Sequence, residues 1–289
     1  MDYVTIIILG IVQGITEFLP ISSDGHLVLV GEVLRRWRGL SADEMNAVPV
    51  IVALHIGTLF SILLVLRHRV WQLAGDPKLV TSVVVATVPL VVIGKPLKDQ
   101  LEALEHSRYL ALVAGLGLCV TAAMMFVAGR IQAGKLELPQ FGDRPRGWRD
   151  ALCVGLMQCL APVPGVSRSG STILAGLLQG YSREAAAQFS FLIALPAIAG
   201  AVVLHLPDLV RKEMGTPIPV LLVGVLVSFV VGVIALNWLL RLVTRSTLLG
   251  FSLYCLILGL GVTIWQIGEL KGESSSPVRI DAAAQKATP

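Results

Sequence analysis

Two short segments place polar residues inside long apolar stretches of the chain, and their residue types suit phosphate chemistry. In the first, Gln13 and Glu17 are four residues apart, so they share one face of a helix. A carboxylate at membrane depth is costly and by default indicates a functional site. We therefore interpret Glu17 as a functional residue, against the alternative that it only hydrogen-bonds a neighbouring helix.

Pro20 interrupts this segment, and Ser22, Ser23, Asp24 and His26 follow it. If a helix resumes near Gly25, the Ser23 hydroxyl and the His26 imidazole, three residues apart, can approach each other. Serine becomes a nucleophile only with a base nearby, so we predict Ser23 as nucleophile and His26 as base. Two alternatives stay open. His26 is a buried histidine with satisfied hydrogen bonds, or His26 or Glu17 activates water directly and Ser23 only binds the substrate.

The second segment combines one guanidinium with hydroxyls and glycines. It contains Gly165, Ser167, Arg168, Ser169 and Thr172, directly before a predicted helix. Backbone N–H groups at a helix N-terminus favour anions, and arginine matches phosphate oxygens with two parallel hydrogen bonds. The segment therefore predicts a phosphate-binding site, unless Arg168 pairs with Glu17 purely as structure.

The composition identifies the environment of these segments. Of 289 residues, 55% are hydrophobic and only 15% are charged, against about 25% charged residues in soluble domains. A soluble enzyme is excluded, and the net charge of +4 falls in short clusters typical of loops between membrane spans. About 20 apolar residues span a bilayer as a helix. The stretches that meet or approach this length are Ala47–Leu66, Leu79–Gly94, Tyr109–Ala128, Ala185–Leu206, Ile218–Leu240 and Leu248–Ile267.

The regions Met1–Leu34 and Ala151–Leu178 each consist of two apolar halves around a break. Non-helical backbone at membrane depth survives only inside protein or around a wet cavity, so we predict two re-entrant hairpins. The fold class is thus an all-α polytopic membrane protein with six full transmembrane helices. The domain covers 1–270, and a disordered tail follows over 271–289.

The two hairpins also match each other, which predicts an internal repeat with halves at about 1–128 and 146–270. Three spans separate the hairpins, so the second must enter from the opposite face. Such an inverted repeat brings two broken segments together at the midplane, and the two tips should touch. A shift of 145 residues pairs Gly10 with Gly155, Gln13 with Gln158, Ser22 with Ser167, Gly25 with Gly170, Leu29 with Leu174 and Gly31 with Gly176.

These motifs closely resemble those of the bacterial undecaprenyl-diphosphate phosphatase family of the bacitracin-resistance type. The resemblance implies removal of the terminal phosphate from the C55 isoprenyl diphosphate, which regenerates the lipid carrier of peptidoglycan synthesis. It implies a carboxylate motif at Gln13 and Glu17, catalytic residues at Ser23 and His26, and phosphate binding by Arg168. The further substrate-binding residues are Ser22, Gly165, Ser167, Ser169 and Thr172.

The resemblance also implies a divalent cation, Mg²⁺ or Ca²⁺. Glu17 and Gln13 are candidate ligands, and Asp24 is a further candidate outside the family pattern. Asp24 departs from the family, in which this position is usually small and hydroxylated. Its carboxylate should repel a diphosphate unless a cation or Arg168 offsets the charge. Asp24 is therefore a helix N-cap, a metal ligand or a sign of altered substrate or pH preference, and its presence leaves metal use open.

The expected partners are the polyisoprenyl diphosphate and the bilayer, with no nucleic acid, and a homodimer is one candidate for the oligomeric state. The expected location is the bacterial inner membrane, with the site on the extracytoplasmic side by resemblance. Lys and Arg divide equally between the two predicted faces, so charge does not orient the chain. The main competing function is a secondary transporter or lipid flippase. A purely structural membrane subunit would leave the buried polar residues unexplained.

Overall fold

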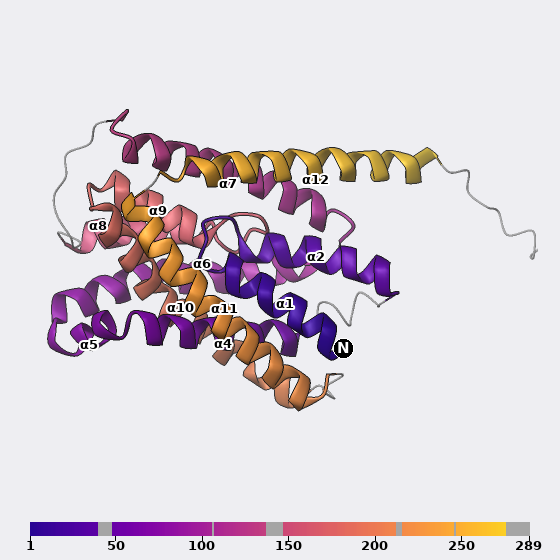
Figure 1. The fold of residues 1–289 in the computed structure, drawn as a ribbon, viewed down its shortest axis with the longest axis horizontal. Coiled ribbons are helices and arrows are strands. Elements are labelled where there is room, and N and C mark those ends of the chain that lie inside the picture. Colours follow the sequence, from indigo (N-terminus) through magenta and orange to yellow (C-terminus); the bar gives the residue numbers. More distant parts are fainter. Residues whose placement is uncertain (40–47, 106, 137–146, 212–215, 246, 276–289) are drawn as a thin grey trace, which may run out of the picture.

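The computed structural model describes residues 1–39, 48–105, 107–136, 147–211, 216–245 and 247–275, and the regular elements in these ranges are helices (Figure 1). The helices are α1 Tyr3–Thr16, α2 Ser23–Arg38, α4 Val48–Val65, α5 Arg67–Gly75, α6 Pro77–Glu105, α7 Leu110–Gln132, α8 Trp148–Gln158, α9 Arg168–Leu178, α10 Arg183–Arg211, α11 Ile218–Arg245 and α12 Leu249–Ser275.

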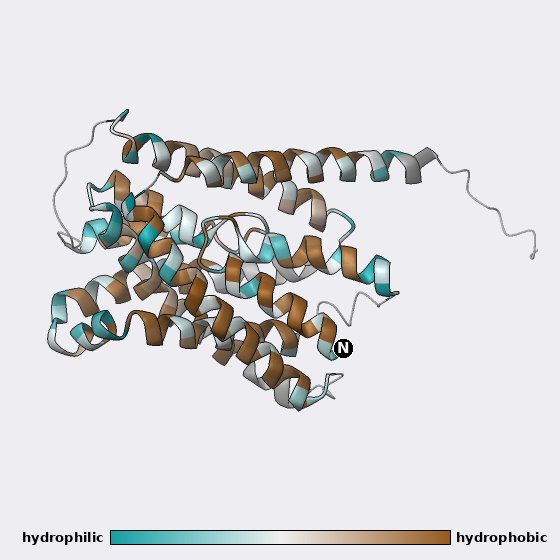
Figure 2. Cartoon of the chain, viewed as in Figure 1, coloured by the Kyte–Doolittle hydropathy of each residue, from teal (hydrophilic) through white to brown (hydrophobic). Residues whose placement is uncertain are grey.

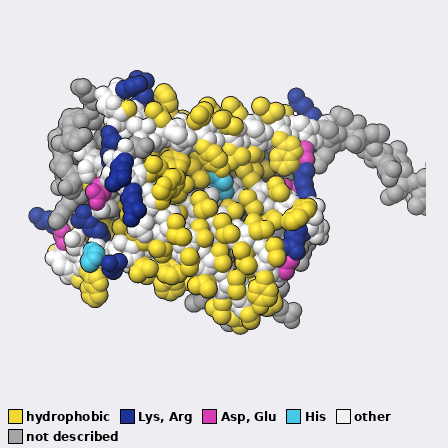
Figure 3. Space-filling view, viewed as in Figure 1, with side chains coloured by type: hydrophobic (Ala, Val, Ile, Leu, Met, Phe, Trp, Pro, Cys, Tyr) yellow, Lys and Arg dark blue, Asp and Glu magenta, His cyan; other side chains and the backbone are white. Residues whose placement is uncertain are grey.

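The predicted fold class is confirmed, because the helices combine into a polytopic membrane protein. Hydrophobic side chains cover the middle of the molecule, and Lys and Arg gather toward its two ends (Figures 2 and 3). Apolar surface of this extent belongs in lipid. Five helices in the described part of the chain are long and apolar enough to span a bilayer: Pro77–Gly94, Leu110–Gln132, Arg183–His205, Ile218–Arg245 and Leu249–Lys271.

A sixth candidate span includes α4, which forms a bent pair with α5, and here the structure differs from the sequence prediction. The predicted span Ala47–Leu66 is represented by α4, but the chain then bends by 73° into α5, which we did not predict as a helix. Charged side chains at Arg67 and Arg69 cannot continue into the hydrocarbon layer. Instead, α5 is short, it buries none of its side chains and it exposes Trp71, as expected for a helix at the membrane surface.

Two other helices extend beyond the bounds predicted from the sequence. The short predicted span Leu79–Gly94 lies within the longer α6, which continues through Pro89 and Pro96. At the C-terminus, α12 extends through Ser275, so the predicted tail 271–289 begins as helix. The rest of that tail lies outside the described residues.

The tips of the two hairpins meet near the middle of the molecule (Figure 1). α1 and α2 form the first hairpin, and α8 and α9 form the second. α1 packs on α11, whereas α8 packs on α6. Gly10 and Gly155 permit these two contacts: an added Cβ would lie 3.0 Å from Val227 Cγ1 and 2.8 Å from Ala86 Cα, respectively.

Residues paired by the 145-residue shift occupy equivalent positions in the two hairpins. Ser22 caps α2 by accepting a hydrogen bond from Gly25 N at 3.2 Å, and Ser167 caps α9 by accepting one from Gly170 N at 3.1 Å. Gln13 and Gln158 are both fully buried. These serine caps explain why the helices resume at Ser23 and Arg168, and each cap satisfies a backbone N–H that lacks a helical partner.

Candidate active site

Glu17 is the centre of the polar cluster where the hairpins meet. Its Oε2 accepts hydrogen bonds from Gln13 Nε2 at 3.0 Å and from Ser23 Oγ at 2.8 Å. Its Oε1 accepts one from Arg168 Nη2 at 2.9 Å, and the side chain is only 5% exposed. Three features bring these donors to one carboxylate. Gln13 lies one helical turn before Glu17, the turn after Pro20 places Ser23, and the start of α9 places Arg168.

The second tip is clamped against α7, which fixes the position of Arg168. Gly165 has φ +87°, a conformation that favours glycine, and packs on the backbone of α7 at Ala114. Thr121 donates its hydroxyl hydrogen to Gly165 O at 2.8 Å and accepts a hydrogen bond from Ser167 N at 2.9 Å. Arg168 therefore starts its helix from a rigid turn.

The predicted contact between the tips is present. Gly25 lies against Gly165 so closely that an added Cβ would be 2.9 Å from Gly165 Cα. Ser169 Oγ donates to Leu19 O at 3.3 Å across the same junction. Ser23 and Arg168 both contact the Glu17 carboxylate, so one small anion can reach both of them.

A cavity of about 190 Å³ opens beside this cluster. The predicted site residues that line it are Glu17, Ser22, Ser23, Asp24, Ser167, Arg168 and Ser169, and the remaining wall includes His55, Leu90, Ala197, Ile198 and Ala201. Arg168 Nη1 is buried, and the described residues provide no hydrogen-bond partner for it. Because Arg168 itself lines the cavity, an anion entering it can satisfy this nitrogen.

The structure does not bring the Ser23 hydroxyl and the His26 imidazole, the predicted nucleophile and base, into hydrogen-bond contact. Ser23 Oγ donates to Glu17 instead. His26 Nδ1 lies 2.7 Å from Ser22 O, and its Nε2 lies 2.7 Å from the hydroxyl of Tyr254 in α12, whose ring stacks on it. A carbonyl only accepts, so Nδ1 carries the hydrogen and Nε2 accepts from Tyr254. His26 thus reaches Ser23 only through the backbone.

Ser22 holds the first tip in an uncommon conformation. Its φ is +71°, and among the described residues it is the one non-glycine with positive φ, which costs of order 1–3 kcal/mol. Its oxygens offset this cost, since Oγ caps α2 and its carbonyl accepts from His26. Strain of this kind is typical of functional turns.

Thr172 supports the second tip from behind. Its hydroxyl contacts Ser190 Oγ of α10 at 2.6 Å and donates to Arg168 O at 2.8 Å. It therefore helps to fix the Arg168 backbone. Gly165 and Gln13 likewise contribute through packing and hydrogen bonding around the cluster.

Three residues near the site were not identified from the sequence: Thr121, Tyr254 and His55. Thr121 and Tyr254 are ordinary span residues by pattern. His55 gave a signal that could have been used, because an ionisable residue inside a predicted span is by default a functional candidate. Its Nε2 lies 3.8 Å from Glu17 Oε2.

The site residues differ in how well they suit a divalent cation. In the described part of the chain no group of three or more His, Cys, Asp or Glu side chains could hold one. Glu17 fits poorly as a ligand, since Gln13, Ser23 and Arg168 already donate to it. Asp24 fits better: it is exposed and lines the cavity. Mg²⁺ commonly binds one or two carboxylates together with substrate phosphates, and Asp24 matches that pattern.

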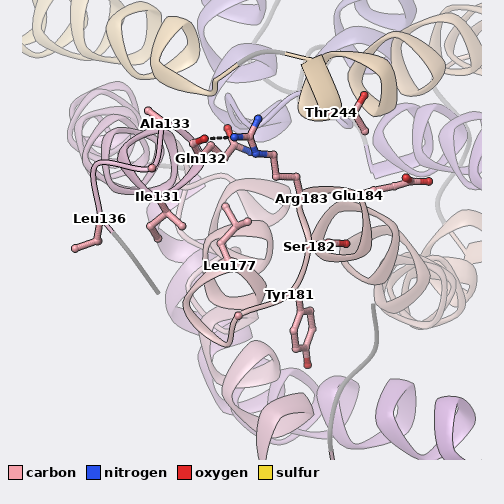
Figure 4. A pocket seen from close by; sticks show the side chains of 12 residues that line it. Ile131, Gln132, Ala133, Leu136, Leu177, Tyr181, Ser182, Arg183, Glu184 and Thr244 are labelled. Carbon is pink, nitrogen blue, oxygen red and sulfur yellow. Dashed lines mark hydrogen bonds between the residues drawn. The ribbon is translucent and has the colours of Figure 1, made fainter. Parts of the chain in front are cut away.

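A larger cavity, of about 800 Å³, lies at the end of α7 next to the connection between α9 and α10 (Figure 4). Arg183 reaches across it and donates to the carbonyl of Gln132. Its lining contains none of the predicted site residues, and its charges lie at one end of the molecule. It is not the candidate active site.

The fold and the site define a class: a polytopic membrane protein with a cavity, lined by Arg168, where two helical hairpins meet. The match to a known family is equally specific. The chain belongs to the family of the bacitracin resistance protein BacA, whose model matches residues 6–261.

Two relatives extend this comparison over nearly the whole chain. An undecaprenyl-diphosphatase of Rhodopirellula baltica is 42% identical over 267 residues, which cover 91% of this chain and 98% of the relative. An undecaprenyl-diphosphatase of Alkaliphilus metalliredigens is 35% identical over 282 residues, which cover 90% and 98%. The family predicted from the motifs is thereby confirmed.

Proposed function

We infer that this chain is an undecaprenyl-diphosphatase, a membrane hydrolase that converts undecaprenyl diphosphate to undecaprenyl phosphate and inorganic phosphate. Family membership and the two relatives support the activity. The structural observation that carries it is the Glu17 carboxylate, which holds the Ser23 hydroxyl at 2.8 Å and the Arg168 guanidinium at 2.9 Å beside one cavity. A candidate nucleophile and a positively charged side chain that can bind phosphate thus lie side by side in a membrane protein.

Arg168 binds the diphosphate in this proposal. Its Nη1 is available for a phosphate oxygen, and the N-terminus of α9 adds the partial positive charge of aligned peptide dipoles. The hydroxyls of Ser167 and Ser169 line the same wall. In phosphoryl transfer, fixed positive groups stabilise the charge spread over the equatorial oxygens of the transition state.

Ser23 is the proposed nucleophile, and Glu17 is the group placed to take its proton. As the Ser23 oxygen bonds to the terminal phosphorus, the bond to the bridging oxygen breaks and undecaprenyl phosphate leaves. Water then releases phosphate from the phosphoserine. His26 positions Ser23 in this scheme, since its ring bonds the preceding carbonyl. Direct attack by water, with Ser23 as a ligand, is the competing route.

Asp24 is the proposed site for a divalent cation, shared with phosphate oxygens of the substrate. Such a cation offsets negative charge on the diphosphate. Activity should therefore fall when EDTA is added, and Asp24→Ser should alter that dependence.

We further propose that the cavity opens on the extracytoplasmic side of the bacterial membrane, as the resemblance to the family implies. The prenyl chain then stays in the bilayer while the phosphates enter the protein. Labelling of Asp24→Cys, an exposed position that lines the cavity, by an impermeant thiol reagent in intact cells, in a background without the four native cysteines, tests to which side the cavity opens.

The decisive experiment is phosphate release from farnesyl diphosphate by detergent-solubilised protein. Hydrolysis needs no sealed compartment, whereas a transporter would give no product. We expect wild type and Arg149→Ala, a control at an exposed arginine, to be active, and Arg168→Ala to lose at least about 100-fold in kcat/KM. Full activity of Arg168→Ala would refute the anion site. Phosphate bound covalently to the wild type, and absent from Ser23→Ala, would support the phosphoserine.

A further inference from the structure

His55 of α4 lies at the site although no motif includes it. It lines the cavity together with Ser23 and Arg168, and its side chain is 20% exposed. His55 Nδ1 lies 2.8 Å from Ile51 O. Because a carbonyl only accepts, Nδ1 must carry the hydrogen, and Nε2 of the neutral ring keeps its lone pair. The backbone of α4 thus fixes which nitrogen faces the site.

The nitrogen that faces the site points toward another acceptor. His55 Nε2 lies 3.8 Å from Glu17 Oε2, which is too far for a direct hydrogen bond. A carboxylate and an imidazole lone pair attract each other only through a donor placed between them. Water has two hydrogens and can donate to both. The cavity of about 190 Å³ that both side chains line has room for it, since a water occupies about 30 Å³.

We propose that His55 is a further catalytic residue, which together with Glu17 holds the attacking water and removes its proton. This inference rests on the proposed phosphatase function. The water oxygen forms a bond to phosphorus, and one water proton passes to His55 Nε2. In the phosphoserine route the bond from phosphorus to Ser23 Oγ breaks, and Ser23 recovers from Glu17 the proton it gave up. In the direct route the bridging oxygen leaves on the prenyl phosphate.

The surroundings of His55 favour this role. The charged groups that share its cavity are Glu17 from the first tip, Asp24 from α2 and Arg168 from α9, while α6 and α10 contribute the apolar Leu90, Ala197, Ile198 and Ala201. Asp24, and Glu17 once it has returned its proton to Ser23, stabilise the proton that His55 accepts, and the apolar side chains form the rest of the wall. His26, by contrast, has both ring nitrogens engaged.

The test measures kcat and KM for farnesyl diphosphate with His55→Gln and His55→Ala, and with His68→Gln as the matched control on the exposed surface of α5. Glutamine keeps a polar side chain but cannot act as a base. We expect kcat to fall about 100-fold or more in both His55 variants, KM to stay within about threefold, and added imidazole to restore part of the activity of His55→Ala.

The inference is overturned if His55→Gln keeps kcat within about threefold of wild type, or if imidazole fails to restore folded His55→Ala. Size-exclusion and thermal unfolding of the purified variants establish that they are folded, and His55→Gln carries the kcat test should His55→Ala not fold. Failure of the wild type and His68→Gln to release phosphate would refute the phosphatase function itself. These two failures are therefore distinguishable.

Discussion

Arg168 and Glu17 form an ion pair at 2.9 Å across 151 positions of sequence, and this pair joins the two hairpins. Both side chains are largely buried, at 13% and 5% exposure. Removal of one partner from a buried ion pair costs about 3–5 kcal/mol, because the other charge is left uncompensated. Loss of either charge should therefore destabilise the junction between the two hairpins.

A double-mutant cycle should reveal this coupling. We expect Glu17→Gln and Arg168→Gln each to lower the thermal unfolding temperature in detergent, and the double variant to be clearly less destabilised than the sum of the two. Activity should be lost in all three variants. Strictly additive effects on stability would show that the two charges do not stabilise each other.

The close approach of the tips predicts a steric effect at Gly25. An added methyl group would lie 2.9 Å from Gly165 Cα, so Gly25→Ala must separate the tips. Overpacking costs about 1–3 kcal/mol, and a displacement of about 1 Å in a site can reduce the rate about 100-fold. Gly261→Ala is the control, since nothing lies within 4 Å of its added Cβ. Equal phosphate release by the two variants would contradict the tip contact.

The strained turn at Ser22 predicts that a glycine variant at this position is more stable than an alanine variant. Ser22→Ala removes the cap of α2 and keeps the side-chain strain, whereas Ser22→Gly removes both. We expect the alanine variant to be the less stable by about 1 kcal/mol, as measured by thermal unfolding in detergent. An alanine variant as stable as the glycine variant would argue against the positive φ of 71°.

The two hydrogen bonds of Thr121 hold the turn before Arg168, so we expect their removal to displace Arg168. Thr121→Val leaves Ser167 N and Gly165 O without their partner, at about 1–3 kcal/mol for each buried group. Thr121→Ser retains the hydroxyl and is the matched control. We expect the valine variant to unfold at lower temperature and to show a raised KM for farnesyl diphosphate. Matching values for the two variants would show that the clamp is dispensable.

The sequence predicted the hairpins well because helix breaks at membrane depth leave a strong signal. Pro20 and the run from Pro164 to Gly165 interrupt otherwise apolar segments, and the serines after them cap the next helices. The contact between the tips could be predicted because three spans separate the hairpins. An odd number makes the hairpins enter from opposite faces, so that their tips meet. The equivalent caps at Ser22 and Ser167 support the internal repeat, and its inverted orientation stays a prediction.

Contacts between side chains were harder to predict. Spacing placed His26 near Ser23, but it could not show that Ser22 takes the cap and turns the imidazole toward Tyr254. It could not show that α4 brings His55 to Glu17, because one polar residue in a span carries no information on its neighbour. The bend after Leu66 depends on where the membrane surface lies, which a hydropathy pattern locates only roughly.

The long separation of Glu17 and Arg168 has a consequence for biogenesis. The ribosome synthesises the N-terminal half first, so the carboxylate enters the lipid phase before its partner has been translated. Gln13 and Ser23, which donate to this carboxylate, belong to the same half of the chain, whereas its cationic partner does not. The ion pair, and with it the finished hairpin junction, can therefore form only after the second hairpin has been inserted.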